Sequence, residues 1–426
     1  MKSIFRCLLM GVAVSLCMSI ASCKDEDFTE TIFDTTEYPL DRSSYTFPLD
    51  TFVKKNFLEP YNLRYLYKMQ DIGSNMDYNL IPCSYDQSIT LAVLCKYLWY
   101  DVYKKTVGEE FLKQYSPRII HVIGSPAYNP TSGTILLGTA EGGLKITLYN
   151  AESLSPSDID YMNEYFFKTM HHEFSHILNQ NFIRPVDFDK ISNGKYNAVD
   201  WQNTPDSVAL GQGFISPYSS EQAREDWVEI IANYIVKDTV TWSRQLNTAS
   251  YSWEDAKDVD ATHFRRIWQQ YRSGRANIDS IGYPIVGRGQ DINNSDNWEV
   301  SATSGGNPAT YRIQRKLIER DSAGYAIPGP NGEIQYKKSS GVNGRDVILQ
   351  KLKYTRDWLK EYFDYDLEAV RMEVQRRQWL TDDDGNFIFD ANGNFINRLT
   401  YQRPDGKALI DDLRQEVENY KALQTK

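Results

Sequence analysis

The sequence predicts an α+β fold in which a small sheet and several helices form one large domain, followed by a mostly helical region of two hairpin-plus-helix repeats. Three observations indicate this arrangement. Short β-like runs and helical periodicity alternate between residues 88 and 179. One predicted helix contains the motif His-Glu-x-x-His, and a tandem repeat begins near residue 305. The chain has 426 residues, 41% of them hydrophobic, which suffices for a large core and excludes disorder throughout.

Residues 1–22 have the composition of a secretory signal peptide, with two basic residues before an apolar run from Cys7 to Met18. The run is shorter than the roughly 20 residues that span a bilayer, which disfavours a transmembrane helix. The following Ser-Ile-Ala-Ser-Cys, ending at Cys23, resembles a bacterial lipobox, in which the chain is cut before the cysteine and the thiol is diacylated. We therefore expect a lipoprotein anchored to a membrane through Cys23.

Residues 24–27 (Lys-Asp-Glu-Asp) resemble the signal that takes lipoproteins of Bacteroidota to the outer face of the outer membrane. A solvated linker would look the same, and residues 23–55 are predicted to be the lipidated cysteine and a tether. The net charge of −10 disfavours nucleic acid as a partner. Besides Cys23, the mature chain contains Cys83 and Cys95, which allow one disulfide, although the apolar stretch 91–99 favours a buried thiol at Cys95.

The elements expected in residues 56–304 follow from periodicity and turn residues. They are a helix at 88–105, β-like runs at 118–123, 134–139 and 144–149, and helices at 155–179, 220–236 and 253–272. Ser155-Pro156-Ser157-Asp158 contains cap and first-turn residues in the expected order, so the helix with the motif begins there.

The motif occupies His172 to His176, and three of the five histidines of the chain lie within six residues. A chance match is expected about 0.004 times in such a chain, which disfavours the alternative of a surface helix with two histidines. Imidazoles four residues apart project from one face of a helix and can both bind Zn²⁺ at ~2.1 Å. Glu173 is placed to accept a proton from water at the metal. His171 is rotated by ~100° from His172, so it is expected in packing or in support of the ligands.

A catalytic zinc site needs a third protein ligand and an open position. No Gly-x-x-His follows His176, so the three-histidine arrangement of metzincins is absent. In the helix at 220–236, Glu225 and Glu229 are four residues apart, so Glu225 is expected to bind zinc and Glu229 to accept an N–H from a ligand imidazole. Asp226 is the alternative ligand, and a solvated acidic face is the alternative to any site here.

This pattern resembles the gluzincins, a zincin-like group of metallopeptidases. It also resembles lethal-factor-type zinc metallopeptidases, in which a tyrosine precedes the glutamate ligand by seven residues. The matching residues are Tyr218, Glu225, Trp227 and Glu229, whereas Asp226 and Val228 depart from the pattern. The resemblance implies that Tyr218 stabilises the oxyanion.

A longer resemblance is to zinc metallopeptidase lipoproteins of Bacteroidota, also described as substrate-import-associated zinc metallohydrolases. It rests on the lipobox, Pro60-Tyr61-Asn62, the motif at 172–176, the stretch from Ser216 to Trp227 and the helix around Lys351–Trp358. This family tends to be encoded beside pairs of an outer-membrane porin and a glycan-binding lipoprotein. The resemblance implies such a pair as possible partners.

Residues 305–426 contain the repeat, in which Gly324 aligns with Gly385 and Asn331-Gly332 with Asn392-Gly393, an offset of 61 residues. Asn-Gly between short apolar segments indicates hairpins, and amphipathic helices are expected at 347–363 and 408–423. Asp382 to Asp384 would suit a calcium loop, but no glutamate stands at the twelfth position, which favours a turn. We expect this region to pack beside the metal domain without supplying ligands.

Three functions are compatible with these residues. The leading hypothesis is a surface-anchored zinc peptidase that cuts peptides or glycopeptides before import. A second is a binding lipoprotein of an import complex that keeps zinc only for structure, against which the intact Glu173 argues, because a structural site has no use for a base. A third is a zinc hydrolase of another amide or acyl group, such as one on a modified sugar.

Overall fold

The computed structural model describes most of the chain from residue 40 onward. The described residues are 40–69, 79–128, 135–136, 138–141, 145–257, 297–304, 310–339, 343–391 and 393–424. The predicted signal peptide, Cys23 and the acidic residues behind it lie outside these ranges, so the lipid anchor stays a prediction. Of the helices within the described ranges, none combines the length and the apolar character needed to cross a membrane.

The folded part of the chain begins inside the segment predicted as a tether. Its first helical stretch consists of α2 (Phe47–Val53), the π-helical turn η1 (Lys54–Leu58) and α3 (Glu59–Tyr61). Leu49, Phe52 and Phe57 from this stretch are buried in the main hydrophobic core. The predicted tether over 23–55 is therefore too long at its C-terminal end, because apolar side chains from residue 47 onward already join the core.

A four-stranded mixed sheet follows. Its strands, in spatial order, are β1 (Arg64–Leu66), β2 (Ile119–Val122), β6 (Lys145–Leu148) and β5 (Gly138–Glu141). The first three run parallel, and β5 pairs antiparallel with β6. The β-like runs at 118–123 and 144–149 are confirmed. The run at 134–139 is divided between β5 and β4 (Ile135–Leu136), which pairs with β3 (Ala127–Tyr128).

The helix predicted for 88–105 is confirmed as a longer stretch against the sheet. It consists of α4 (Tyr85–Cys95), η2 (Lys96–Tyr100) and α5 (Asp101–Thr106), and α6 (Glu109–Tyr115) follows. Cys95 is fully buried, with its Sγ 3.8 Å from Sδ of Met170. Both Cys83 and Cys95 are free, so the buried thiol expected at Cys95 is confirmed.

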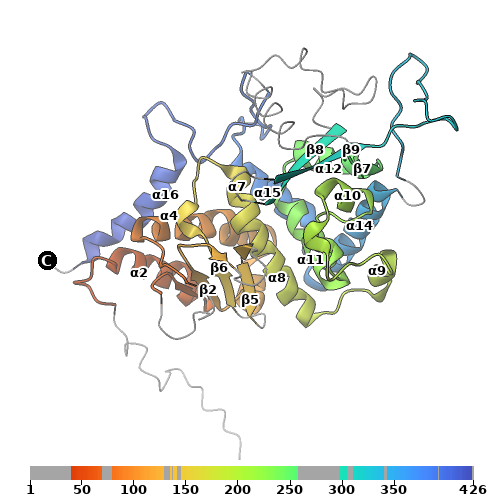
Figure 1. Ribbon diagram of the computed structural model, residues 1–426. Coiled ribbons are helices and arrows are strands. Elements are labelled where there is room, and N and C mark those ends of the chain that lie inside the picture. Colours follow the sequence, from red (N-terminus) through yellow and green to blue (C-terminus); the bar gives the residue numbers. More distant parts are fainter. Residues whose placement is uncertain are drawn as a thin grey trace, which may run out of the picture.

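The helix that contains the motif is also confirmed, although it begins four residues later than predicted, at Ile159. After η3 (Ala151–Ser153), it runs through α7 (Ile159–Met162), the π-helical turn η4 (Asn163–Phe167) and α8 (Lys168–Asn181). Asp158 caps it, because its Oδ1 accepts the backbone N–H of Tyr161 at 2.9 Å. The helix predicted for 220–236 is confirmed as α11 (Ala223–Val236). Figure 1 shows α8 between the four-stranded sheet and α11.

Short helices connect α8 to α11, and a longer helix follows α11. They are α9 (Val186–Ile191), η5 (Trp201–Asn203), α10 (Asp206–Gly211), η6 (Tyr218–Ser220) and α12 (Thr239–Ala249). The turn η6 packs against α11, and Ser216 in the segment before it donates a hydrogen bond to Glu229 of α11.

The helix predicted for 253–272 is wrong at its start. Residues Trp253–Asp255 form strand β7, and the predicted remainder from residue 258 lies outside the described residues. β7 pairs with β9 (Thr310–Lys316), which pairs in turn with β8 (Trp298–Ser304). Arg312 and Arg315 of β9 form ion pairs with Asp255 and Glu254 of β7. Pairing with a strand more than 50 residues away is invisible to local periodicity.

Two hairpins of the C-terminal region have matching bridges. The pairs Ile318–Tyr336, Arg320–Ala326 and Pro328–Ile334 recur as Trp379–Asn397, Thr381–Phe387 and Phe389–Phe395. The helices are α14 (Gly344–Phe363), α15 (Leu367–Gln378), α16 (Leu409–Glu418) and η8 (Asn419–Leu423), of which α15 was not expected from the sequence. Oδ1 of Asp382 accepts the backbone N–H groups of Asp384 and Asn386, as in a turn.

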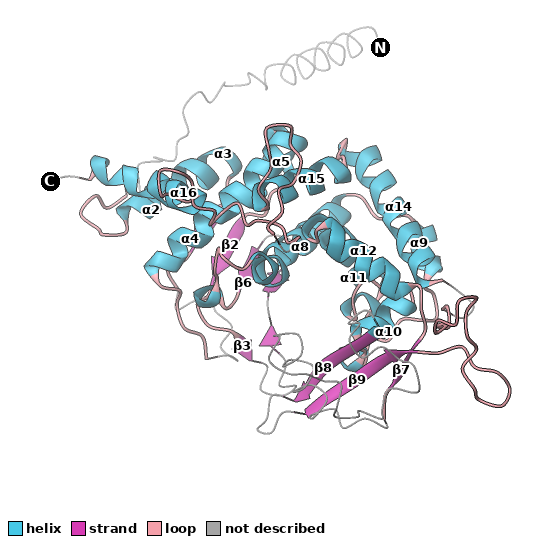
Figure 2. Cartoon of the chain, turned by 90° about the horizontal axis from the view of Figure 1, so that it is seen from above, coloured by secondary structure: helices cyan, strands magenta, loops and turns pink. Residues whose placement is uncertain are grey.

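One hydrophobic cluster joins the two predicted regions within the described residues. It extends in sequence from Leu49 to Val417. Helices α14 and α15 pack against α11, while α16 packs against α2 and α4 at the other end of the molecule (Figure 2). The core therefore continues across the boundary expected at residues 304 and 305.

Candidate metal centre

Helix α8 has two different faces. Met170, Phe174 and Leu178 recur at four-residue spacing and are buried in the core, with 0%, 1% and 1% of their surface exposed. His172 and His176 lie on the opposite face, because two residues correspond to about 200° of rotation on a helix. That face meets α11, so the histidines and the acidic first turns of α11 come together.

Three predicted ligands converge at this contact. Oε2 of Glu225 lies 3.2 Å from Nε2 of His172 and 3.1 Å from Nε2 of His176. Ligands at 2.0–2.2 Å from a tetrahedral zinc ion are separated by roughly 3.4 Å, so both distances from Glu225 are close to those between zinc ligands. The other oxygen of Glu225 accepts a hydrogen bond from Nε of Arg224 at 3.1 Å.

Without a metal, His172 and the carboxylates near it shift each other's pKa values. Burial lowers the pKa of His172, but hydrogen bonds to Glu225 and Glu229 outweigh it and raise the pKa to about 10. Burial raises the pKa of Glu225, yet the two histidines lower it further, and the net shift is downward. A cationic imidazole between carboxylates occupies the place of a metal cation, so a metal that binds must displace that proton.

Glu229 holds the other side of the His172 ring. Its Oε1 lies 2.8 Å from Nδ1 of His172, and its Oε2 accepts hydrogen bonds from Ser216 Oγ at 2.6 Å and Asn233 Nδ2 at 3.1 Å. Burial acts to raise the pKa of Glu229, but the charge of Lys168 and the contact with His172 lower it to about 2. The carboxylate is therefore ionised and accepts from Nδ1, which leaves Nε2 directed at the metal position.

Glu173 lies beside the two histidines. A carboxylate oxygen of Glu173 and one ring nitrogen each of His172 and His176 lie within 4.8 Å of one another. The Glu173 side chain is largely buried, and this burial is the main reason that its pKa is raised. A carboxylate with a raised pKa is suited to accept a proton and release it again.

Tyr218, at the start of η6, packs against the ring of His172. The two ring centroids are 5.7 Å apart and the planes are inclined by 26°, while the ring centroid of Trp201 lies 4.8 Å from that of Tyr218. Burial, together with Glu225 and other nearby carboxylates, raises the pKa of Tyr218. The phenol therefore keeps its proton at neutral pH and can donate it in a hydrogen bond.

Comparison with known proteins identifies the family. Residues 43–368 match the model of a family described as "putative zinc-binding metallo-peptidase". The chain belongs to this family. A solved structure described as a "putative zinc-binding metallo-peptidase" from Bacteroides caccae is similar, with 27% sequence identity, a TM-score of 0.50 and coverage of 78% of this chain and 91% of that one. No curated protein matches the chain.

The family confirms two sequence predictions, a zinc metallopeptidase and Zn²⁺ as its cofactor. The donor set of this metallopeptidase agrees with that cofactor, because two imidazoles and a carboxylate are typical of catalytic zinc sites. The individual roles of His172, Glu173, His176, Tyr218, Glu225 and Glu229 stay predictions, although the structure brings all six into one place.

Two other sequence candidates lie outside the set of converging atoms. The Asp226 carboxylate is directed at Nζ of Lys351, 2.6 Å away, so the structure does not place it as a ligand. His171 is fully buried and its Nδ1 lies 2.9 Å from the hydroxyl of Tyr103, which agrees with the packing role expected for it.

Sequence reasoning missed the residues that hold the metallopeptidase site in position. Ser216, Asn233 and Lys351 each contact an acidic residue of α11. Of these, only Lys351 left a signal, because it stands in the apolar stripe of α14 between Val347 and Thr355, where a lysine must be paired.

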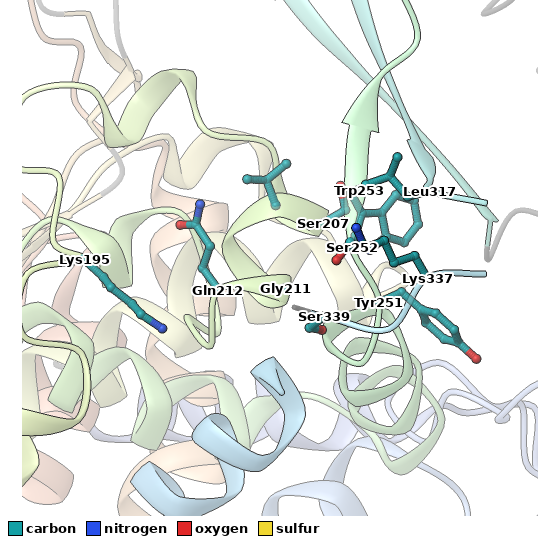
Figure 3. A pocket seen from close by; sticks show the side chains of 11 residues that line it. Lys195, Ser207, Gly211, Gln212, Tyr251, Ser252, Trp253, Leu317, Lys337 and Ser339 are labelled. Carbon is teal, nitrogen blue, oxygen red and sulfur yellow. The ribbon is translucent and has the colours of Figure 1, made fainter. Parts of the chain in front are cut away.

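The structure also contains a cavity apart from the metal centre. Its volume is about 340 Å³, and none of the six candidate site residues lines it. Side chains from α10, from residues 251–253 and from residues 337–339 surround it, including Gln212, Tyr251 and Ser339 (Figure 3). The cavity therefore lies where α10 meets the three-stranded sheet of β7, β9 and β8.

Proposed function

We propose that this zinc metallopeptidase is a lipid-anchored enzyme that hydrolyses peptides or glycopeptides at the cell surface as a step in nutrient import. The observation that supports hydrolysis most directly is the position of Glu225, whose Oε2 lies within 3.2 Å of Nε2 of both histidines. His172, His176 and Glu225 would hold the zinc ion and leave its remaining position for water and substrate.

Zinc bound there lowers the pKa of a water molecule and polarises the substrate carbonyl. Glu173 accepts the proton of the attacking water and later transfers it to the leaving amine, for which its raised pKa is suited. The hydroxyl of Tyr218 donates a hydrogen bond to the oxyanion that forms at the scissile carbonyl. Glu229 keeps His172 in the tautomer that presents Nε2 to the metal.

The anchored location rests on the sequence. Cys23 follows a signal-like apolar run and precedes an acidic cluster, the combination found in surface lipoproteins of Bacteroidota. The link to import, with a porin and a glycan-binding lipoprotein as partners, rests on the resemblance to the import-associated family. Labelling of cells with a palmitate analogue should modify the wild-type chain and not Cys23→Ala, and protease added to intact cells should degrade the wild-type chain. Absence of label on the wild type would contradict the anchor.

The activity is tested by incubating the zinc-loaded mature chain with a complex mixture of peptides and glycopeptides and identifying the products by mass spectrometry. We expect new termini with the wild type and none with Glu173→Gln, which keeps the shape of the side chain but cannot accept a proton. The variant must contain as much zinc as the wild type for the comparison to hold. Equal cleavage by both proteins would exclude Glu173 as the base, and release of a non-peptide acyl group would favour the alternative substrate class.

A further inference from the structure

Helix α14 makes an ionic contact with the helix that carries the candidate ligand Glu225. Nζ of Lys351 lies 2.6 Å from Oδ2 of Asp226, and the two side chains are 0% and 1% exposed. We propose that Lys351 is a positioning residue of the metal centre: from the C-terminal region, it fixes both Glu225 and the segment that presents Tyr218. The part concerning Tyr218 rests on the proposed function.

The first connection is to the ligand. Glu225 and Asp226 stand next to each other in the first turn of α11, and the preceding N-cap residue, Gln222, forms no side-chain cap hydrogen bond. The first turn of a helix has backbone N–H groups without partners and frays easily when it is not capped. Asp226 is instead held from outside, by Lys351 and by the hydroxyl of Tyr196 at 3.0 Å. Fixing Asp226 fixes the backbone of Glu225.

The second connection is to the loop before η6. Nζ of Lys351 donates a hydrogen bond to the backbone carbonyl of Gly213 at 2.7 Å. Gly213 is followed closely by Ser216, which donates to Glu229, and by Tyr218. One buried ammonium group therefore joins α14 both to the helix that carries Glu225 and to the loop that leads to Tyr218.

The N-terminal half of α14 has little freedom to move along this surface. A Cβ atom on Gly344 would lie 2.3 Å from the carbonyl oxygen of Leu210, so the backbones touch there. A Cβ on Gly213, whose φ is +90°, would lie 2.5 Å from Cγ1 of Val347. These close contacts restrict sliding of α14 along the surface, and in this arrangement Lys351 lies against Asp226 and Gly213.

A buried ion pair is weak evidence for stability, because apolar residues of similar volume often serve as well or better. Its specific contribution is direction. Lys351 meets a carboxylate, a carbonyl oxygen and the face of Phe214, whose ring centroid lies 4.2 Å from Nζ. An apolar pair could fill this space but could not fix the orientation of α11 and the loop in the same way.

The test is therefore a double variant, Lys351→Met with Asp226→Leu, which removes both charges and keeps the volume. Its zinc dissociation constant is measured by competition with a chelator, and the absorption spectrum of the Co²⁺-loaded protein reports the ligand geometry. We expect zinc binding roughly 10- to 100-fold weaker, as for other groups that orient metal ligands, and an altered cobalt spectrum. Wild-type zinc affinity with an unchanged spectrum would overturn the proposal.

A milder variant decides the question if the double variant does not fold. Lys351→Arg keeps a cation beside the buried Asp226 carboxylate but moves it from the position that Nζ takes between Asp226 and the carbonyl of Gly213. Here we expect a smaller but measurable loss of zinc affinity, and an affinity equal to that of the wild type would contradict the proposal. The control is Lys105→Met, which breaks the ion pair of α5 with Glu373 of α15; this pair involves none of the candidate ligands, so the cobalt spectrum should stay unchanged.

Zinc affinity and the cobalt spectrum do not depend on the substrate. If the wild type binds zinc but cleaves no peptide, the proposed function fails while these two readouts still test Lys351. If a substrate is found, the double variant should lower kcat at least 10-fold, since Tyr218 would be displaced as well.

Discussion

Oε1 of Glu229 lies 2.8 Å from Nδ1 of His172. Glu229 stands one helical turn after Glu225 on α11, so this helix contacts both nitrogens of the same ring, with Glu225 at Nε2 and Glu229 at Nδ1. Two glutamates one helical turn apart on α11 can thus contact both nitrogens of one imidazole on α8. Two bonds from Ser216 and Asn233 then fix Glu229 itself.

Glu229→Gln should weaken zinc binding by about 10-fold or more, because the amide keeps the shape but removes the charge that favours the Nδ1–H tautomer. The measurement is chelator competition at neutral pH. The matched control is Glu110→Gln, because the side chain of Glu110 is 86% exposed. This control variant should bind zinc as the wild type does. An unchanged zinc affinity in Glu229→Gln would remove Glu229 from the metal centre.

Tyr218→Phe should fold and bind zinc normally, while kcat falls by about 100-fold, the usual loss for one oxyanion donor. The KM should change little, because the hydrogen bond forms mainly in the transition state. Tyr45→Phe changes a tyrosine that is 74% exposed and serves as the matched control. A kcat equal to that of the wild type would leave Tyr218 with a packing role beside His172 and Trp201.

Removal of zinc should make the protein lose thermal stability as the pH rises above neutral. In the metal-free protein the pKa of His172 is raised from 6.5 to about 10. A raised pKa in the folded state contributes stability that is complete below pH 6.5 and is lost as the pH rises through about 10. We expect the Tm of the chelator-treated protein to fall between pH 7 and pH 10 by more than that of the zinc-loaded protein. Parallel curves for the two forms would contradict a cationic His172 in the metal-free site.

Truncation after residue 304 should abolish cooperative unfolding and stoichiometric zinc binding. Helices α14 and α15 cover α11, where Trp227 and Trp358 contact at a centroid distance of 5.2 Å. Without these helices, Trp227 and its neighbours would be exposed to water, and Asp226 would lose Lys351. Thermal unfolding followed by tryptophan fluorescence checks this. A truncated chain that unfolds cooperatively and binds one zinc would show that the metal domain folds alone.

Local patterns in the sequence were enough to predict the helix of His172, the helix of Glu225 and the strands β2 and β6, although not that these strands pair in parallel. The signals were apolar spacing, the cap and first-turn residues between Ser155 and Asp158, and the motif itself, all contained within short windows. Contacts between distant segments left no such signal. The pairing of β7 with β9 overrode helical periodicity at Trp253, and the ion pair of Lys351 with Asp226 joins residues 125 positions apart.

Asp226 illustrates the difference most clearly. Spacing favoured Glu225 as the ligand, because it shares a helix face with Glu229, but it left Asp226 as the alternative. Its partner on α14 decides which way its carboxylate points. Knowledge of the fold was required before that partner could be identified.

The central claim is that one zinc ion binds to Nε2 of His172, Nε2 of His176 and the carboxylate of Glu225. Diffraction data collected on both sides of the zinc absorption edge, from crystals of the zinc-loaded protein, test it most directly. The account predicts one anomalous peak per chain at about 2.1 Å from each of these three groups. Glu229 should not bind the zinc ion itself and, among the ligands, should contact only the ring of His172. A peak ligated by Asp226, or a zinc ion held elsewhere in the chain, would contradict it.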